Sequence, residues 1–418
     1  MKTIKVDNRP FVKNIKSVNR VVVDMYFPIK DSNLDTAKRA MLKRILNYYS
    51  DKYRDNYSFY NKVDSLYILK YSVSTLLFRE VSYFRFSLIL PKEGIIDEYN
   101  LEEALTFFKE AIFNTCIDED HFDDNVFELE KTYLIDYDKS FPNNIYDYVQ
   151  NEYWKYIDEK EELGLTHEHY YDLVKKITSK EVYDYYMNNI YNNNYLVYIY
   201  GNVKDKNRYI DIFNKVFKRK DRITYIKANF CNFRKDFEYS HKEEKTKYNQ
   251  SVLCFNYAIK DMKESEITLF DMLYDMLDSK ENALIFNELR TKNNLIYSNS
   301  LQTKKHYGFF NIYVLYNEVD YKDIINYVES AIKSLYDRDV FEECKDKQVK
   351  SLKYTLLYKE DEPFDELFSK IETKISDEID FNKRIERVEK TSYEEFTKFL
   401  DKLVLTKTYL FTGGDNNA

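Results

Sequence analysis

Residues 283–300 of the chain read Ala-Leu-Ile-Phe-Asn-Glu-Leu-Arg-Thr-Lys-Asn-Asn-Leu-Ile-Tyr-Ser-Asn-Ser. We expect Arg290 to end a helix and Tyr297 to open a strand, so that the turn between them can bring both side-chain tips together. A guanidinium carries a permanent charge and several donors, and a phenol contributes one hydroxyl. The plain alternative places Arg290 in a surface ion pair and Tyr297 in core packing.

Outward from this segment, strands and amphipathic helices alternate in two successive series, one in each half of the chain. In the stretch Tyr83–Leu90 apolar residues recur at every second position, as in a strand, and in the stretch 34–49 they recur at helical spacing. The expected strands are Val21–Phe27, Tyr83–Leu90, Tyr195–Tyr200, Ser251–Tyr257, Phe309–Leu315 and Thr408–Phe411. The expected helical regions are 34–49, 101–114, 123–188, 264–277, 321–336 and 341–400.

The ends of the two series can be laid over one another. Thr178 is followed three residues later by Glu181, and Ser392 by Glu395. This spacing is typical of a capping box, which fixes the start of a helix. In both halves the capped helix is followed by a strand that stops at glycine. The recurrence at an offset of about half the chain indicates a duplication.

The duplication predicts an α+β protein of two related domains, each a mostly antiparallel sheet covered by helices. We expect an N-terminal domain over residues 1–225 and a C-terminal domain over residues 249–418. The charged stretch 226–248 between them is predicted to be a solvated linker. Two such domains joined by a linker could close around a cavity as a clamshell.

Composition excludes several classes of protein. Of the 418 residues, 44% are hydrophobic, which is enough for a sizeable core. The net charge of −8 has no clustered basic stripe, so we expect no nucleic-acid partner. The sequence shows neither a signal-peptide pattern nor a long apolar run, so we expect no membrane association. The four cysteines are widely spaced and predicted to be reduced, which favours a soluble cytoplasmic protein.

The residues that usually carry catalysis are scarce. Among the five histidines there is no pair at the i, i+4 spacing that metal hydrolases use. His167 and His169, on either side of Glu168, would point to opposite sides of a helix and are predicted to be exposed residues at a helix start. Phosphate loops and nucleophile elbows are also absent from the sequence. From these residues alone, the sequence indicates a two-domain peptide- or protein-binding molecule.

The segment over residues 283–300 changes this interpretation. Residues 285–298 follow the pattern Leu-Phe-x-x-Leu-Arg-x-x-x-x-Leu-x-Tyr-Ser, with Ile285 in place of the first Leu. This resembles the C-terminal-half signature of the pitrilysin/insulinase family of peptidases, the inverzincins. The family fold is two related α+β domains that form a clamshell, and the strand over Tyr195–Tyr200 with its Gly-Asn turn resembles the end of the family's N-terminal domain.

The resemblance implies a role for Arg290 and Tyr297. In the family, the matching Arg and Tyr hold the substrate carbonyl and the charge that develops on it. Peptide hydrolysis passes through a tetrahedral oxyanion, and one donor placed for it lowers the barrier by about 3–4 kcal/mol.

The zinc half of the family pattern is missing. Active members carry His-x-x-Glu-His on the first helix of the N-terminal half, which supplies two zinc ligands and a general base. Residues 31–50 contain neither His nor Glu. A third ligand would fall near Glu128 and Glu130, which we assign to a solvated helix face. Lys38, Arg39, Lys43 and Arg44 are expected to make this region positive and to repel a dication.

The combination resembles the zinc-free subunit of bacterial heterodimeric members. It implies no cofactor in this chain and a homologous partner that carries His-x-x-Glu-His and the zinc. Together the two subunits would cleave a peptide, for example in leader-peptide removal, while this chain alone would be inactive. The alternative is a catalytically inactive scaffold or peptide-binding protein of the same fold, in which Arg290 and Tyr297 are incidental.

Overall fold

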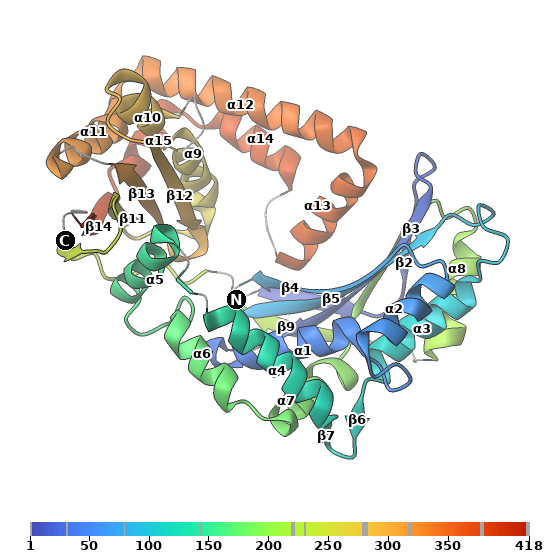
Figure 1. Cartoon of the computed structure of the whole chain (residues 1–418). Helices are drawn as coiled ribbons and strands as arrows, with labels where there is room; N and C mark the ends of the chain where they lie inside the picture. The colour runs from blue at the N-terminus through green and yellow to red at the C-terminus, as the bar shows by residue number, and fades with distance from the viewer. Residues whose placement is uncertain are drawn as a thin grey trace. The chain divides into compact units, whose positions relative to one another are not determined.

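A computed structural model describes residues 2–30, 32–78, 80–139, 141–142, 144–218, 222–229, 231–277, 283–316, 320–376 and 380–414 (Figure 1). The chain forms two units, each with its own hydrophobic core. The first unit comprises Met1–Phe141 and Lys160–Phe230, and the second comprises Pro142–Glu159 and Cys231–Ala418.

The first unit is built on a five-stranded sheet in the order β2-β8-β3-β5-β4, with the ribbon β1-β9 and the small pair β6-β7 beside it. Its strands are β1 Lys2–Asp7, β2 Phe11–Asn14, β3 Arg20–Ile29, β4 Lys70–Phe78, β5 Val81–Pro91, β6 Ile117–Asp118, β7 His121–Phe122, β8 Leu196–Gly201 and β9 Ile223–Ala228. Its helices are α1 Thr36–Tyr48, α2 Asn56–Ser65, α3 Leu101–Phe113, α4 Asp124–Lys139, α6 His167–Lys176, α7 Ser179–Tyr186 and α8 Lys206–Phe217, with the short turns η1 Asn33–Asp35 and η2 Met187–Tyr191.

The second unit is built on a five-stranded sheet in the order β10-β14-β11-β13-β12. Its strands are β10 Ser240–Lys245, β11 Ser251–Ile259, β12 Ser298–Lys304, β13 Phe309–Tyr316 and β14 Leu403–Thr412. Its helices are α5 Ile145–Ile157, α9 Ile267–Leu277, α10 Leu284–Phe286, α11 Tyr321–Lys333, α12 Arg338–Asp361, α13 Pro363–Ser376, α14 Phe381–Lys390 and α15 Tyr393–Leu400. Four short turns join them, η3 Glu264–Glu266, η4 Asn287–Lys292, η5 Lys305–Tyr307 and η6 Ser334–Tyr336.

The two sheets have the same topology, strand for strand. In each sheet, the strand that comes first in the chain (β2 or β10) is parallel to its neighbour, the strand that comes last (β8 or β14). All other neighbouring strands are antiparallel. The predicted cap at Thr178 is a reciprocal capping box with Glu181. Ser392 also caps its helix, but Glu395 instead pairs with Arg387. The predicted α+β fold of two sheet-bearing halves is confirmed.

Side chains along the central strand point alternately to the two faces of the sheet, and in each unit one of these faces packs against the helices. In the first unit, Val21, Val23, Met25 and Phe27 of β3 lie in the core with the apolar residues of α1 and α3. Burial of these side chains is the main favourable term in the stability of the unit. The sheet therefore holds α1, the helix where the His-x-x-Glu-His motif of active family members would lie, in a fixed place.

Helix α5 packs on the sheet of the second unit although the first half of the chain encodes it. Tyr153 is fully buried, with its ring centroid 5.6 Å from that of Tyr313 on β13 and 6.4 Å from that of Tyr409 on β14. Residues 142–159 lie within the span 1–225 that we assigned to the N-terminal domain. The span 226–248, assigned to a linker, includes the end of β9 and all of β10.

None of the helices in the described ranges combines the length and the apolar character needed to cross a bilayer.

Candidate functional site

The segment around Arg290 and Tyr297 forms a turn from helix to strand. Helix α10 continues into the π-helical turn η4, which ends at Lys292, and β12 begins at Ser298. Leu289 and Ile296 are buried and anchor both ends of the turn. Between them Asn294 adopts a left-handed conformation with φ of 50°, which Asn tolerates better than most residues.

Arg290 is exposed and lies at this helix end. Its Nη1 donates to the Asn294 side-chain oxygen at 3.1 Å and to the Ile296 carbonyl at 2.7 Å. Both acceptors are neutral. The nearby Glu288 pairs with Lys292 at 2.7 Å. Within the described ranges Arg290 has no carboxylate partner, so the ion pair of the alternative interpretation is not observed there.

Tyr297 directly precedes β12 and has 56% of its surface exposed. Its backbone N–H donates to the Leu315 carbonyl at 3.0 Å, which fixes the backbone from which the side chain projects. Core packing of Tyr297, the other part of the alternative, is therefore not what the structure shows. Arg290 therefore lies near the helical end of the turn and Tyr297 next to its strand end, and the meeting of their two side-chain tips stays a prediction.

The first unit contains a second group of polar residues, where α1 packs against α4. Glu130 on α4 is only 2% exposed. One carboxylate oxygen accepts from Arg44 Nε, and the other accepts from the Tyr49 hydroxyl at 2.6 Å. The assignment of Glu130 to a solvated helix face was wrong, whereas Glu128 is exposed. A buried carboxylate needs such partners because its desolvation is costly.

Tyr49 is held as a neutral donor in this group. Burial raises the pKa of its hydroxyl well above the ordinary value, and the hydrogen bond to Glu130 and the charge of that carboxylate raise it further. The phenol therefore keeps its proton at any physiological pH and remains a donor to Glu130. The result is a three-residue contact in which one anion is shared by a cation and a hydroxyl.

The arrangement does not fit a zinc ion. Both oxygens of Glu130 are engaged, and α1 offers no imidazole. The cation that faces Glu130 is Arg44, which would repel a dication. Arg39, counted above among the cations of this region, is 8% exposed and donates to the Thr36 hydroxyl at 3.1 Å. The described residues contain no cluster of three metal-ligating side chains.

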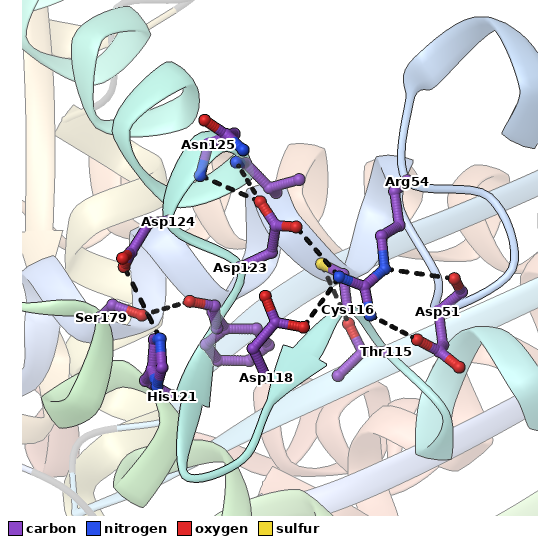
Figure 2. A network of polar contacts seen from close by, with 12 residues as sticks. Asp51, Arg54, Thr115, Cys116, Asp118, His121, Asp123, Asp124, Asn125 and Ser179 are labelled. Carbon is purple, nitrogen blue, oxygen red and sulfur yellow. Dashed lines mark hydrogen bonds and ion pairs between the residues drawn. The ribbon is translucent and has the colours of Figure 1, made fainter.

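Next to Arg44 lies an open cavity of about 340 Å³. It is lined by residues of α1, the following loop, the start of α2 and one side of α4, namely Arg44, Tyr48, Tyr49, Arg54, Asp55, Asn56, Asn125, Val126, Leu129, Glu130 and Tyr133. The second arginine, Arg54, is fully engaged. It donates to Asp51, Asp118 and Asp123 at 2.7, 2.8 and 3.0 Å (Figure 2).

His167 and His169 lie at the start of α6, as predicted. Thr166 caps this helix by accepting from the His169 backbone N–H. The His169 ring contacts Glu161, and the His167 ring stacks on Phe141 at 3.9 Å. Both side chains are half-buried, so they are less exposed than we expected.

Two features of these sites were missed in the sequence. Asn294, which orients Arg290, carries a usable signal, because Asn often follows the last turn of a helix in a left-handed conformation. Glu130 shares a helical face with the buried Val126 and Phe127, at spacings of four and three residues. That spacing predicts a buried position, but only the fold shows that Arg44 and Tyr49 are there to compensate the charge.

Comparison with known proteins supports the family resemblance. Residues 176–349 match the family profile described as the peptidase M16 inactive domain. No curated protein sequence matches the chain significantly.

Similar folds extend over the whole chain. A conserved protein from Enterococcus faecalis has a TM-score of 0.81 at 16% identity, covering 100% of this chain and 99% of its own. A protease from Helicobacter pylori has a TM-score of 0.71 at 11% identity, with 98% and 99% covered. A peptidase M16 inactive domain from Pseudomonas fluorescens has a TM-score of 0.66 at 11% identity, with 99% and 98% covered. The profile match confirms the resemblance to the peptidase M16 family, that of pitrilysin and insulinase, over residues 176–349, and the structural matches confirm the fold over the whole chain.

Proposed function

We propose that this chain is the non-metal subunit of a heterodimeric zinc endopeptidase. Arg290 and Tyr297 would contact the carbonyl of the peptide bond that a zinc-bearing partner cleaves. The observation that carries the proposal is the exposed guanidinium of Arg290, whose charge is not neutralised by any carboxylate in the described ranges. Leader-peptide processing is one reaction of this class.

Arg290 has the properties of a preorganised donor. Nη1 is used for two hydrogen bonds to the turn, while Nε and Nη2 have no hydrogen-bond partner among the described residues. Because the two acceptors are neutral, the full positive charge remains available to a developing oxyanion. Fixing the side chain beforehand reduces the entropy that substrate binding would otherwise cost.

Strand β12 supplies a place for an extended peptide. It lies at the edge of its sheet and pairs only with β13 within the described sheet. An open strand edge can add a peptide as a further strand, with main-chain hydrogen bonds giving affinity. Tyr297 and Arg290 lie at the start of this edge, so a peptide on β12 would pass both side chains.

The first unit supports the assignment of the metal to a partner subunit. Both carboxylate oxygens of Glu130 are already engaged by Arg44 and Tyr49, which makes this residue unsuited to hold a zinc ion. We therefore assign the metal, the general base and the attacking water to a partner of the same family that carries His-x-x-Glu-His.

The test is turnover of a quenched peptide by this chain mixed with such a partner. The chain alone should be inactive, and the mixture active. Arg290→Ala and Tyr297→Phe should each lower turnover by about ten- to a thousand-fold. Tyr354→Phe is a matched control for Tyr297→Phe, since Tyr354 is exposed and lies on α12, outside the turn that carries Arg290.

Unchanged turnover in both Arg290→Ala and Tyr297→Phe would contradict the assigned role. Failure of any zinc-bearing homologue to bind or activate the chain would instead favour the scaffold alternative. Co-purification from the native host followed by metal analysis separates the two, because zinc should follow the partner and not this chain.

A further inference from the structure

The cavity beside Arg44 has the features of a binding site in its own right. Its volume of about 340 Å³ lies in the range of small-ligand sites. The exposed side chains Leu129 and Tyr133 stand on one side of it, with 48% and 55% of their surfaces accessible. Large apolar side chains of this kind, next to a few polar groups, are typical of ligand pockets.

Arg44 presents free donors to this cavity. Its Nε is bound to Glu130, while Nη1 and Nη2 have no hydrogen-bond partner in the described part of the chain. Its guanidinium lies 5.8 Å from the Tyr48 ring centroid and 5.2 Å from the Tyr133 ring centroid. The ion pair and the two rings hold the side chain in place, so binding would order little further.

The charges around the cavity decide which acceptor fits. Glu130 neutralises Arg44, and Arg54 is outnumbered by its three aspartates. Asp55, also in the lining, adds another carboxylate. The lining itself carries two positive side chains, Arg44 and Arg54, and two negative ones, Asp55 and Glu130, so an anion would lose its hydration without a net attraction to offset the loss. An uncharged carbonyl oxygen can accept from the Nη groups without that cost.

We infer that this cavity binds an uncharged residue within a peptide chain. A large apolar side chain, aromatic or aliphatic, would contact Tyr133 and Leu129, while its backbone carbonyl accepts from Arg44. Asn56 and Asn125 line the same cavity and can complement further amide groups. All of these residues belong to the first unit, so the inference does not depend on Arg290, Tyr297 or a partner.

The test uses small probes and saturation-transfer NMR on the full chain. N-acetylphenylalanine amide should bind, whereas N-acetylphenylalanine, with a free carboxylate, and N-acetylalanine amide should bind several-fold more weakly. Arg44→Lys keeps a cation for Glu130 but loses the Nη groups, so affinity for the amide should fall about ten-fold, the effect of one hydrogen bond to a charged group.

Two tyrosines on α4 give a matched comparison. Tyr133→Ser should weaken binding of the amide several-fold, whereas Tyr137→Ser, one turn further and outside the lining, should leave it unchanged. Both tyrosines are exposed, at 55% and 82%, so neither change is expected to unfold the chain. These variants keep the test valid even if Arg44→Lys does not fold.

Three outcomes would overturn the inference. Tighter binding of the free carboxylate would make the cavity an anion site. Equal binding by wild type, Arg44→Lys and Tyr133→Ser would place the probe elsewhere. Loss of binding in Arg290→Ala alone would assign the probe to the turn of the second unit, and it would leave the proposed peptidase function standing.

Discussion

Arg44 in the first unit and Arg290 in the second each use one nitrogen of the guanidinium in hydrogen bonds that hold the side chain in place. The partners of these hydrogen bonds differ. Arg44 Nε contacts the buried carboxylate of Glu130. Arg290 Nη1 contacts a neutral amide and a neutral carbonyl at an exposed turn. The first arginine compensates a buried charge, and the second does not.

This difference separates stability from binding. Removing one partner of a buried ion pair leaves the other charge without compensation, which is costly. Removing an exposed arginine that donates only to neutral groups costs little in folding, but it removes a positive charge from the surface. We therefore expect the loss of Arg44 to destabilise its unit, in addition to any effect on ligand binding in the cavity, and the loss of Arg290 to affect mainly turnover.

The largest effect is expected from Arg44→Met. Glu130 would stay buried without its cation, and the free energy of unfolding should fall by about 3 kcal/mol, at the low end for buried pairs because the Arg44 side chain is 31% exposed. Urea unfolding followed by far-UV circular dichroism measures the change. The only tryptophan, Trp154, lies in the second unit, so its fluorescence should report a much smaller shift.

A double variant sharpens this result. Arg44→Met combined with Glu130→Leu removes both charges and should recover most of the lost stability, because an apolar replacement of a buried pair is often neutral. If the double variant is as unstable as Arg44→Met alone, the cost arises from packing and not from the uncompensated carboxylate.

Tyr49→Phe should have the next largest effect. It removes one hydrogen bond to a charged group and leaves the ring in place, so we expect a loss of about 1.5–3 kcal/mol in the same measurement. Tyr48→Phe is the control, as its hydroxyl makes no such bond within the described residues. Equal effects of the two changes would contradict the role of the Tyr49 hydroxyl.

Acid should destabilise the first unit through Asp123. Burial alone would raise the pKa of this carboxyl, but its hydrogen bonds from the Val126 amide and from Arg54 outweigh burial and lower it. Because the folded pKa lies below the ordinary value of 3.8, the stabilisation is present above about pH 4 and is lost as the pH falls further.

The size of this acid effect should be about 0.5–1 kcal/mol, since Arg54 is a surface residue. Asp123→Asn keeps an acceptor for the Val126 amide and removes the charge, so its urea midpoint should change less between pH 5 and pH 2.5. An unchanged pH dependence in this variant would show that other carboxyls carry the effect.

The smallest effect on folding is expected at the turn of the second unit. Arg290→Met should change the free energy of unfolding by less than about 0.5 kcal/mol, read from Trp154 fluorescence. Asn294→Gly keeps the left-handed backbone, so it should be similarly mild, although the loss of its side-chain acceptor leaves Arg290 less well held. If Arg290→Met lowered the free energy of unfolding as much as Arg44→Met does, both arginines would be structural and the contrast between them would not hold.

Much of the fold follows from local patterns. The central strands β3, β5, β11 and β13 have apolar residues at alternate positions, and the predicted segments fall within their bounds. The charged strand β10 was missed because its sequence lacks this alternation. Strand β10, Ser-His-Lys-Glu-Glu-Lys, is stabilised by its parallel pairing with β14, which no local pattern reveals.

The sequence by itself determined the duplicated plan, the turn that carries Arg290 and Tyr297, and the lack of histidines at the expected metal helix. These features depend on residues close together in the chain. Only the tertiary structure decided that α5 packs on the second sheet and that Glu130 is buried against Arg44. The physical reason is that burial and charge compensation are set by contacts between residues far apart in sequence, such as positions 44 and 130, which periodicity along the chain cannot encode.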